Sequence, residues 1–149
     1  MVLEKLVGKK VKRVFFNEDN LKFETEDGNF TYGVEGDCCS SSYFYDFYGV
    51  KNLLNNGAIT EVKEVDLHPD DIAKTKGDWS TEKDRKYEDD SIQVYGYQLT
   101  TISPEFGEVT SVVSFRNYSN GYYGGWMEEV SDREVLPEIF DDVIETENK

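Results

Sequence analysis

The chain has 149 residues, of which 38% are hydrophobic and 14% aromatic, and its 31 acidic and 16 basic side chains give a formal net charge of −15. This length predicts a single domain over residues 1–149, with a core in which aromatic side chains bury much of the apolar area. No apolar run reaches the roughly 20 residues of a membrane helix, and the negative charge disfavours binding to nucleic acid or to an anionic membrane.

Three strands are predicted in the first part of the chain. Residues 11–16 and 21–25 are rich in β-branched and aromatic residues that approximately alternate with polar ones, and the run "NEDN" between them is typical of a turn. The dipeptide Asp27-Gly28 suits a tight turn with positive φ, and "FTYGVE" follows it. We therefore expect an antiparallel meander.

The stretch "EGDCCSSSYFYDFYG" at residues 35–49 changes the period of the pattern. Apolar residues now recur at spacings of four, three and four, which predicts a helix with one face formed by Tyr43, Phe47, Val50 and Leu54, beside Phe44. The serines that precede them can cap its first turn. Gly49 disfavours a helix interior by about 1 kcal/mol relative to Ala, which leaves open a break there and a separate turn over "KNLL".

The remainder of the chain predicts four more strands and a terminal helix. One strand is expected from Ala58 in "AITEVKEVDL", and three antiparallel strands in "IQVYGYQLTTI", "EVTSVVSFRNY" and "YYGGWMEEV". Residues 73–91 have mixed charge and little periodicity, which indicates a mobile charged loop. Residues 131–149 predict an acidic C-terminal helix or tail. The expected fold class is α+β: a largely antiparallel sheet, one aromatic-rich helix packed on a face, and a short C-terminal helix.

Two adjacent thiols are the first candidates for chemistry. Cys38 and Cys39 precede the predicted helix, whose dipole would lower the pKa of a thiol at that end. A metal site formed by the two thiols and His68, the one histidine of the chain, would need Asp37 as its fourth ligand. Two adjacent cysteines do not have the spacing of structural zinc ligands. We therefore expect no catalytic residue, no metal and no cofactor. A small thiol- or metal-dependent enzyme centred on Cys38, Cys39 and His68 is the alternative.

The candidate binding residues form two groups. Asp37, Cys38 and Cys39 lie at the entry to the predicted helix, while Tyr122, Tyr123 and Trp126 surround Gly124-Gly125. This glycine pair lacks the Lys-Ser/Thr that completes a phosphate-binding loop. The three aromatic side chains of the second group could stack on nucleic-acid bases. Alternatively, together with Tyr95 and Tyr97, they line a ligand cleft. The negative charge disfavours nucleic acid, and only residues 9–13 are basic enough to contact phosphate.

The charges are unevenly distributed. Residues 1–16 contain five basic side chains and one acidic one, so the rest of the chain is more acidic than the whole. Such a surface either is simply solvated or engages a basic partner. The beginning, "MVLEKLVGKKVKRVFF", lacks the uninterrupted apolar stretch of a signal peptide, and we expect a cytoplasmic location with reduced thiols.

Three motifs carry a family resemblance. "GDCCSSSYF", the "NLL" that follows it and "FRNYSNGYYGG" at residues 115–125 resemble small uncharacterised proteins of tailed phages and prophages. The resemblance covers most of residues 5–128, and the acidic tail and the charged loop near Lys83 are peculiar to this chain. It implies a phage-encoded protein in the host cytoplasm but assigns no mechanism. The expected function is a non-enzymatic acidic binding protein, an accessory factor that engages or inhibits a host protein with a basic surface, for example in anti-defence.

Overall fold

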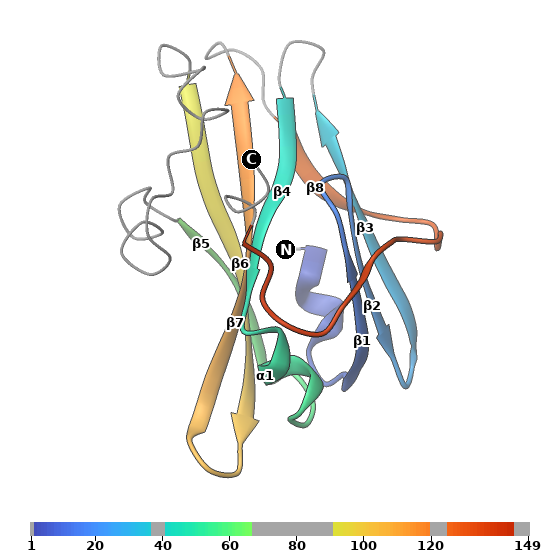
Figure 1. Ribbon diagram of the computed structural model, residues 1–149, viewed down its shortest axis with the longest axis vertical. Helices are drawn as coiled ribbons and strands as arrows, with labels where there is room; N and C mark the ends of the chain where they lie inside the picture. The colour runs from blue at the N-terminus through green and yellow to red at the C-terminus, as the bar shows by residue number, and fades with distance from the viewer. Residues whose placement is uncertain (1, 37–40, 67–90, 120–124, 145–149) are drawn as a thin grey trace.

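The computed structural model describes residues 2–36, 41–66, 91–119 and 125–144, which form two antiparallel sheets packed face to face (Figure 1). The first sheet has the order β8-β3-β2-β1-β9 and the second the order β4-β7-β6-β5. In the first sheet the strands are β1 (Val11–Phe16), β2 (Asn20–Thr25), β3 (Gly28–Gly36), β8 (Gly125–Val130) and β9 (Glu138–Ile139). In the second they are β4 (Ser41–Tyr48), β5 (Glu61–Asp66), β6 (Ser91–Ser103) and β7 (Gly107–Ser119). A 3-10 helix, η1 (Val2–Leu6), and a short helix, α1 (Val50–Leu54), complete the described elements.

The core between the sheets is aromatic, as the composition predicts. Phe47 lies at its centre, with ring centroids 5.5 Å from Phe16 and 6.3 Å from Phe23. Phe44 extends the cluster to Phe115 of β7, at 5.7 Å. These five rings come from four strands of both sheets and are at most 4% exposed, so their burial is a main source of the fold's stability.

The predicted aromatic helix is wrong, and with it the α+β fold class. Residues 41–48 form strand β4, paired with β7, and only Val50–Leu54 are helical. A bulge between Phe44 and Phe47 shifts the register, so these two rings enter the core at a spacing of three, which imitates a helical repeat. Tyr43 and Tyr45 are also buried, so the strand shows no alternation of apolar and polar residues.

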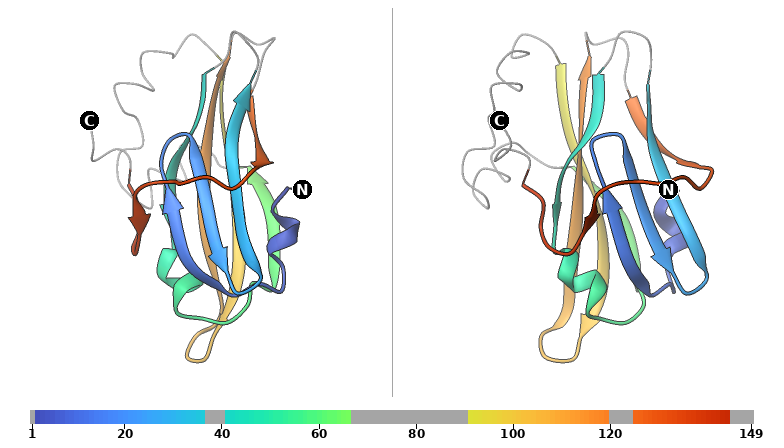
Figure 2. Two further views of the ribbon diagram at one scale, coloured as in Figure 1. Left: turned by 90° about the vertical axis from the view of Figure 1, so that its right-hand side faces the viewer. Right: turned by 45° about the vertical axis from the view of Figure 1, so that its right-hand side comes forward.

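The predicted C-terminal helix is wrong too. Residues 131–144 form an extended segment that crosses the first sheet from β8 and contributes β9 to its far edge (Figure 2). The three late strands also pair differently from the prediction: β6 and β7 form a long hairpin, but β8 joins β3 in the other sheet. The meander β1-β2-β3 and the strand β5 are confirmed. The predicted mobile loop at 73–91 lies almost wholly outside the described residues.

No helix in the described part of the chain is long and apolar enough to cross a membrane.

Tyr32→Phe is expected to leave the protein as stable at neutral pH or slightly more stable, by up to about 1 kcal/mol. The Tyr32 hydroxyl is buried and has no hydrogen-bond partner among the described residues. Burial, and then the nearby Glu129 carboxylate, raise the pKa of Tyr32 above its ordinary value of 10.0. The neutral phenol is therefore favoured in the folded state, and stability is lost as the pH rises above about 10. Urea unfolding of both proteins at neutral pH and near pH 11 measures this; a variant as sensitive to alkali as the parent would contradict it.

Candidate functional site

Most of the residues singled out in the sequence lie outside the described part of the structure. This holds for Asp37, Cys38, Cys39, His68, Tyr122 and Tyr123. Trp126 is the second residue of β8 and pairs with Glu35 of β3, and Tyr95 lies in β6. Tyr97 is buried at 6% exposure and belongs to the core, which corrects its assignment to an open cleft. The segments 37–40 and 120–124 connect strands that end beside one another, because Gly36 pairs with Gly125 and Ser41 with Tyr118 (Figure 1).

The basic N-terminal residues, the one predicted phosphate contact, are used within the fold. The ammonium of Lys9 lies 3.1 Å from the Asp27 carboxylate, and the Arg13 guanidinium lies 3.6 Å from that of Glu24. Lys5 pairs with Glu129 at 2.7 Å, and Lys10 donates to the last carbonyls of α1. Lys5, Lys9 and Arg13 are therefore each partly compensated by a carboxylate, while Lys12 is exposed.

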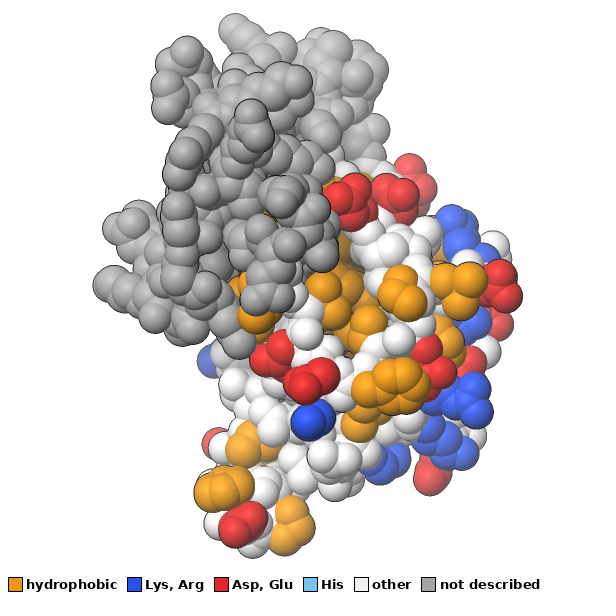
Figure 3. All heavy atoms as spheres, viewed as in Figure 1, with side chains coloured by type: hydrophobic (Ala, Val, Ile, Leu, Met, Phe, Trp, Pro, Cys, Tyr) orange, Lys and Arg blue, Asp and Glu red, His pale blue; other side chains and the backbone are white. Residues whose placement is uncertain are grey.

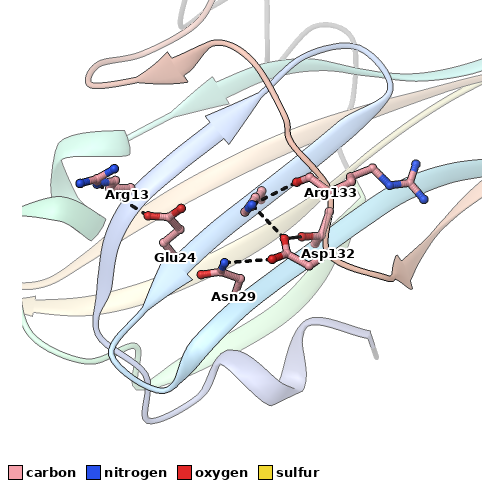
Figure 4. A network of polar contacts seen from close by, with 7 residues as sticks. Arg13, Glu24, Asn29, Asp132 and Arg133 are labelled. Carbon is pink, nitrogen blue, oxygen red and sulfur yellow. Dashed lines mark hydrogen bonds and ion pairs between the residues drawn. The ribbon is translucent and has the colours of Figure 1, made fainter.

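Sequence reasoning missed the segment that organises one side of the molecule, residues 131–144, which we call the strap. Its Asp132 carboxylate accepts hydrogen bonds from Asn29 at 3.1 Å and Thr31 at 3.3 Å, both in β3, and lies 2.8 Å from Nζ of Lys22 in β2 (Figure 4). Lys22 also donates to the carbonyl of Arg133 at 3.0 Å. The alternation of β2 and β3 places these donors on the outer face of the first sheet.

The aliphatic part of the strap continues this docking. Val135 is 2% exposed, and Asn17 donates to the carbonyl of Leu136 at 2.9 Å. Ile139 of β9 pairs with Val14 of β1, and Val143 exchanges both backbone hydrogen bonds with Phe47 of β4, at 2.9 and 3.1 Å. The strap therefore bridges the edges of both sheets. A sequence signal exists in the spacing Val135, Ile139, Val143, but a period of four equally suits a helix.

Asp132→Asn is expected to destabilise the protein at neutral pH by an amount that disappears in acid. The hydrogen bond from Lys22, followed by that from Asn29, lowers the Asp132 pKa from 3.8 to about 2. The stabilisation by the carboxylate is therefore present above pH 3.8 and is lost as the pH falls toward 2. Denaturant unfolding of parent and variant across this range measures the difference. Glu61→Gln, an exposed carboxylate of β5, is the control; a difference independent of pH would contradict the assignment.

The strap covers two cavities. One, of about 390 Å³, lies on the outer face of the first sheet, between the strap and Phe15, Lys22 and Glu24. The other, of about 260 Å³, lies where the strap bridges β1 and β4. Its lining is mainly apolar: Phe16, Asn17, Glu18, Phe44, Pro137, Ile139 and Val143.

Near the second cavity, whose lining includes Glu18, the strap and the β1–β2 turn carry apolar and acidic side chains, which together we call the edge face. It comprises the exposed Leu136 and Phe140, at 60% and 64%, and the carboxylates of Glu18, Asp19 and Glu138. On this side of the molecule, apolar side chains gather across the middle and acidic ones lie beside them (Figure 3). Such a surface offers an apolar contact together with attraction for cations.

Within the described ranges, no three side chains of the types His, Cys, Asp or Glu lie close enough together to hold a metal ion.

Comparison with known proteins gives one match. The model of a family described as a domain of unknown function, DUF7448, matches residues 4–128. This range contains both sheets except β9 and the end of β8, and it stops before the strap. No curated protein and no solved structure matches.

Proposed function

The chain belongs to the DUF7448 family, and from this premise we propose that it is a non-enzymatic acidic binding protein that engages a host protein with a basic surface. The setting suggested by the sequence motifs is a phage or prophage, in which such an accessory factor inhibits its target, for example a host defence protein. The edge face is the binding surface in this proposal.

The observation that carries the proposal is the composition of the edge face. Leu136 and Phe140 expose most of their apolar area to solvent, and three carboxylates lie in the same segments or in the adjoining β1–β2 turn. Exposed aromatic side chains are typical anchors of protein interfaces, while carboxylates at the rim select a basic partner and accelerate its approach. The net charge of −15 acts in the same direction over a longer range.

The internal pairing of the N-terminal cations supports the same assignment. Lys5, Lys9 and Arg13 each face a carboxylate of a neighbouring element. These three cations therefore contribute to holding the fold together.

The test uses the full-length chain as bait in a host lysate, with the captured proteins identified and then eluted in rising salt. We expect basic proteins that elute as the ionic strength increases. The double variant Glu18→Gln/Asp19→Asn and the variant Phe140→Ala should each lose them.

The matched control is Glu61→Gln/Glu64→Gln, which removes the same charge from β5 at the opposite edge of the second sheet. It should retain the partners. Neutral partners held equally well at high salt, or equal losses with both double variants, would overturn the proposal.

A further inference from the structure

The outer face of the first sheet holds a carboxylate by donors from its own strands. Three donors from two adjacent strands converge on Asp132: Nζ of Lys22, Nδ2 of Asn29 and Oγ1 of Thr31. With the strap in place the Lys22 side chain is only 11% exposed, and its ammonium lies 5.8 Å from the centre of the Phe15 ring in the same sheet. Hydrogen bonds to charged groups of this kind are stronger than those between neutral groups.

The strap fills this face incompletely. A solvent-open pocket of about 390 Å³ remains between the strap and the outer face, and a second of about 260 Å³ lies where the strap bridges β1 and β4. Its ladder pairing is short as well, with two residues on β1 and one bridge to β4. A segment with larger apolar side chains would have more contacts available in the same place.

The strap is also an addition to the part of the chain that the family model covers. The match ends at residue 128, whereas the sheet residues that hold the strap lie within the match, namely Val14, Lys22, Asn29, Thr31 and Phe47. The residues that bind the strap therefore belong to the family region, and the strap itself lies outside that region.

We propose that the outer face of the first sheet, continued along the edge of β1, is a docking groove for an extended peptide, and that the strap occupies it as an exchangeable ligand within the same chain. The peptide carries a carboxylate, an aliphatic residue three positions later and a bulky apolar residue four positions after that, as Asp132, Val135 and Ile139 do. The strap in this groove also carries Leu136, Glu138 and Phe140 of the edge face, so its displacement would remove part of the acidic surface in the proposed function. The groove itself binds a peptide that carries a negative charge.

The test keeps the whole chain present. A specific protease site is inserted between Val130 and Ser131, the folded protein is cut, and a labelled synthetic peptide of residues 131–144 is added. Fluorescence anisotropy then reports whether the labelled peptide replaces the resident strap, and circular dichroism reports whether the sheets persist.

We expect the cut protein to stay folded and the labelled peptide to bind and to be displaced by unlabelled peptide. The Asp132→Asn peptide should bind about tenfold more weakly or worse, because it loses a charge-assisted bond. Asp141→Asn, which removes the same charge from an ion pair whose two side chains are more than 60% exposed, should bind within about twofold of the parent. Val143→Phe should bind at least as tightly, because a larger ring enters the 260 Å³ cavity.

Unfolding on cleavage would show that the strap is an integral part of the fold and would overturn the proposal. So would failure of the peptide to exchange, or equal binding of the Asp132→Asn and parent peptides. If the uncut chain forms dimers by exchanging straps, the groove's partner is a second copy and the assignment to a foreign peptide is overturned. The lysate experiment uses the uncut chain with its strap in place, whereas this experiment uses the cut chain, so failure of one proposal can be distinguished from failure of the other.

Discussion

Phe47→Ala is expected to lower the free energy of unfolding by about 3–5 kcal/mol. Phe47 is fully buried and packs edge-on against Phe16 at 5.5 Å and Phe23 at 6.3 Å. Truncation removes both ring contacts and leaves a cavity between the two sheets, which cannot close without moving β4. The same residue also holds the strap through its backbone, but those hydrogen bonds are available to Ala. Urea or thermal unfolding at neutral pH measures the loss.

Phe106→Ala provides the matched comparison. It deletes the same side chain at the tip of the β6–β7 hairpin, where Phe106 is 76% exposed. The unfolding free energy should change by no more than about 0.5 kcal/mol. Equal losses at positions 47 and 106 would show that Phe47 is not the centre of the core.

Gly49→Ala is expected to cost roughly 2–4 kcal/mol, a large effect for one added methyl group. Gly49 has φ +73°, a left-handed conformation that costs other residues about 1–2 kcal/mol. A Cβ there would lie 2.5 Å from the carbonyl oxygen of Thr110. That oxygen is backbone and already accepts a hydrogen bond from Asn52 at 2.7 Å, so relieving the clash disturbs the contact between α1 and β7.

Two neighbouring bonds make position 49 still less tolerant. Ser111 of β7 donates to the Gly49 carbonyl at 2.6 Å, and the Gly49 N–H donates to the Asp142 carboxylate of the strap at 2.8 Å. Gly57→Ala is the control, because its Cβ would have no atom within 4 Å. Denaturant unfolding should separate the two variants clearly. A Gly49→Ala protein as stable as the Gly57→Ala protein would contradict the strained geometry.

Local patterns determined the pairing of strands that follow one another in the chain. The alternation in residues 11–16 and 21–25 and the Asp27-Gly28 turn predicted the meander β1-β2-β3, and Gly28 has the positive φ expected of it. Two of the predicted antiparallel strands form the β6–β7 hairpin, and Gly107, where β7 begins, also has positive φ. In each case the partner strand is the next one along the chain, so short-range information suffices.

The candidate site was far less accessible to sequence reasoning. The residues chosen for their chemistry, Cys38, Cys39 and His68, lie outside the described structure. Asp132 and Lys22, which are far apart in the chain, gave no signal, because each is an ordinary charged residue until the fold brings them within 2.8 Å of each other. Their significance depends on a contact between distant segments that no local pattern encodes.

The sequence by itself determined an acidic, β-rich protein with an aromatic core, because charge, strand propensity and tight turns are properties of single residues and of short runs. Only the tertiary structure decided that residues 41–48 are a strand, that β8 leaves β7 to pair with β3, and that residues 131–144 are extended. In β4, burial on both faces and a bulge mask the alternation of a strand. In β8 and residues 131–144, pairing with a distant sheet edge decides the structure. Apolar spacings of three and four therefore identify which residues are buried but not whether the backbone is helical or extended.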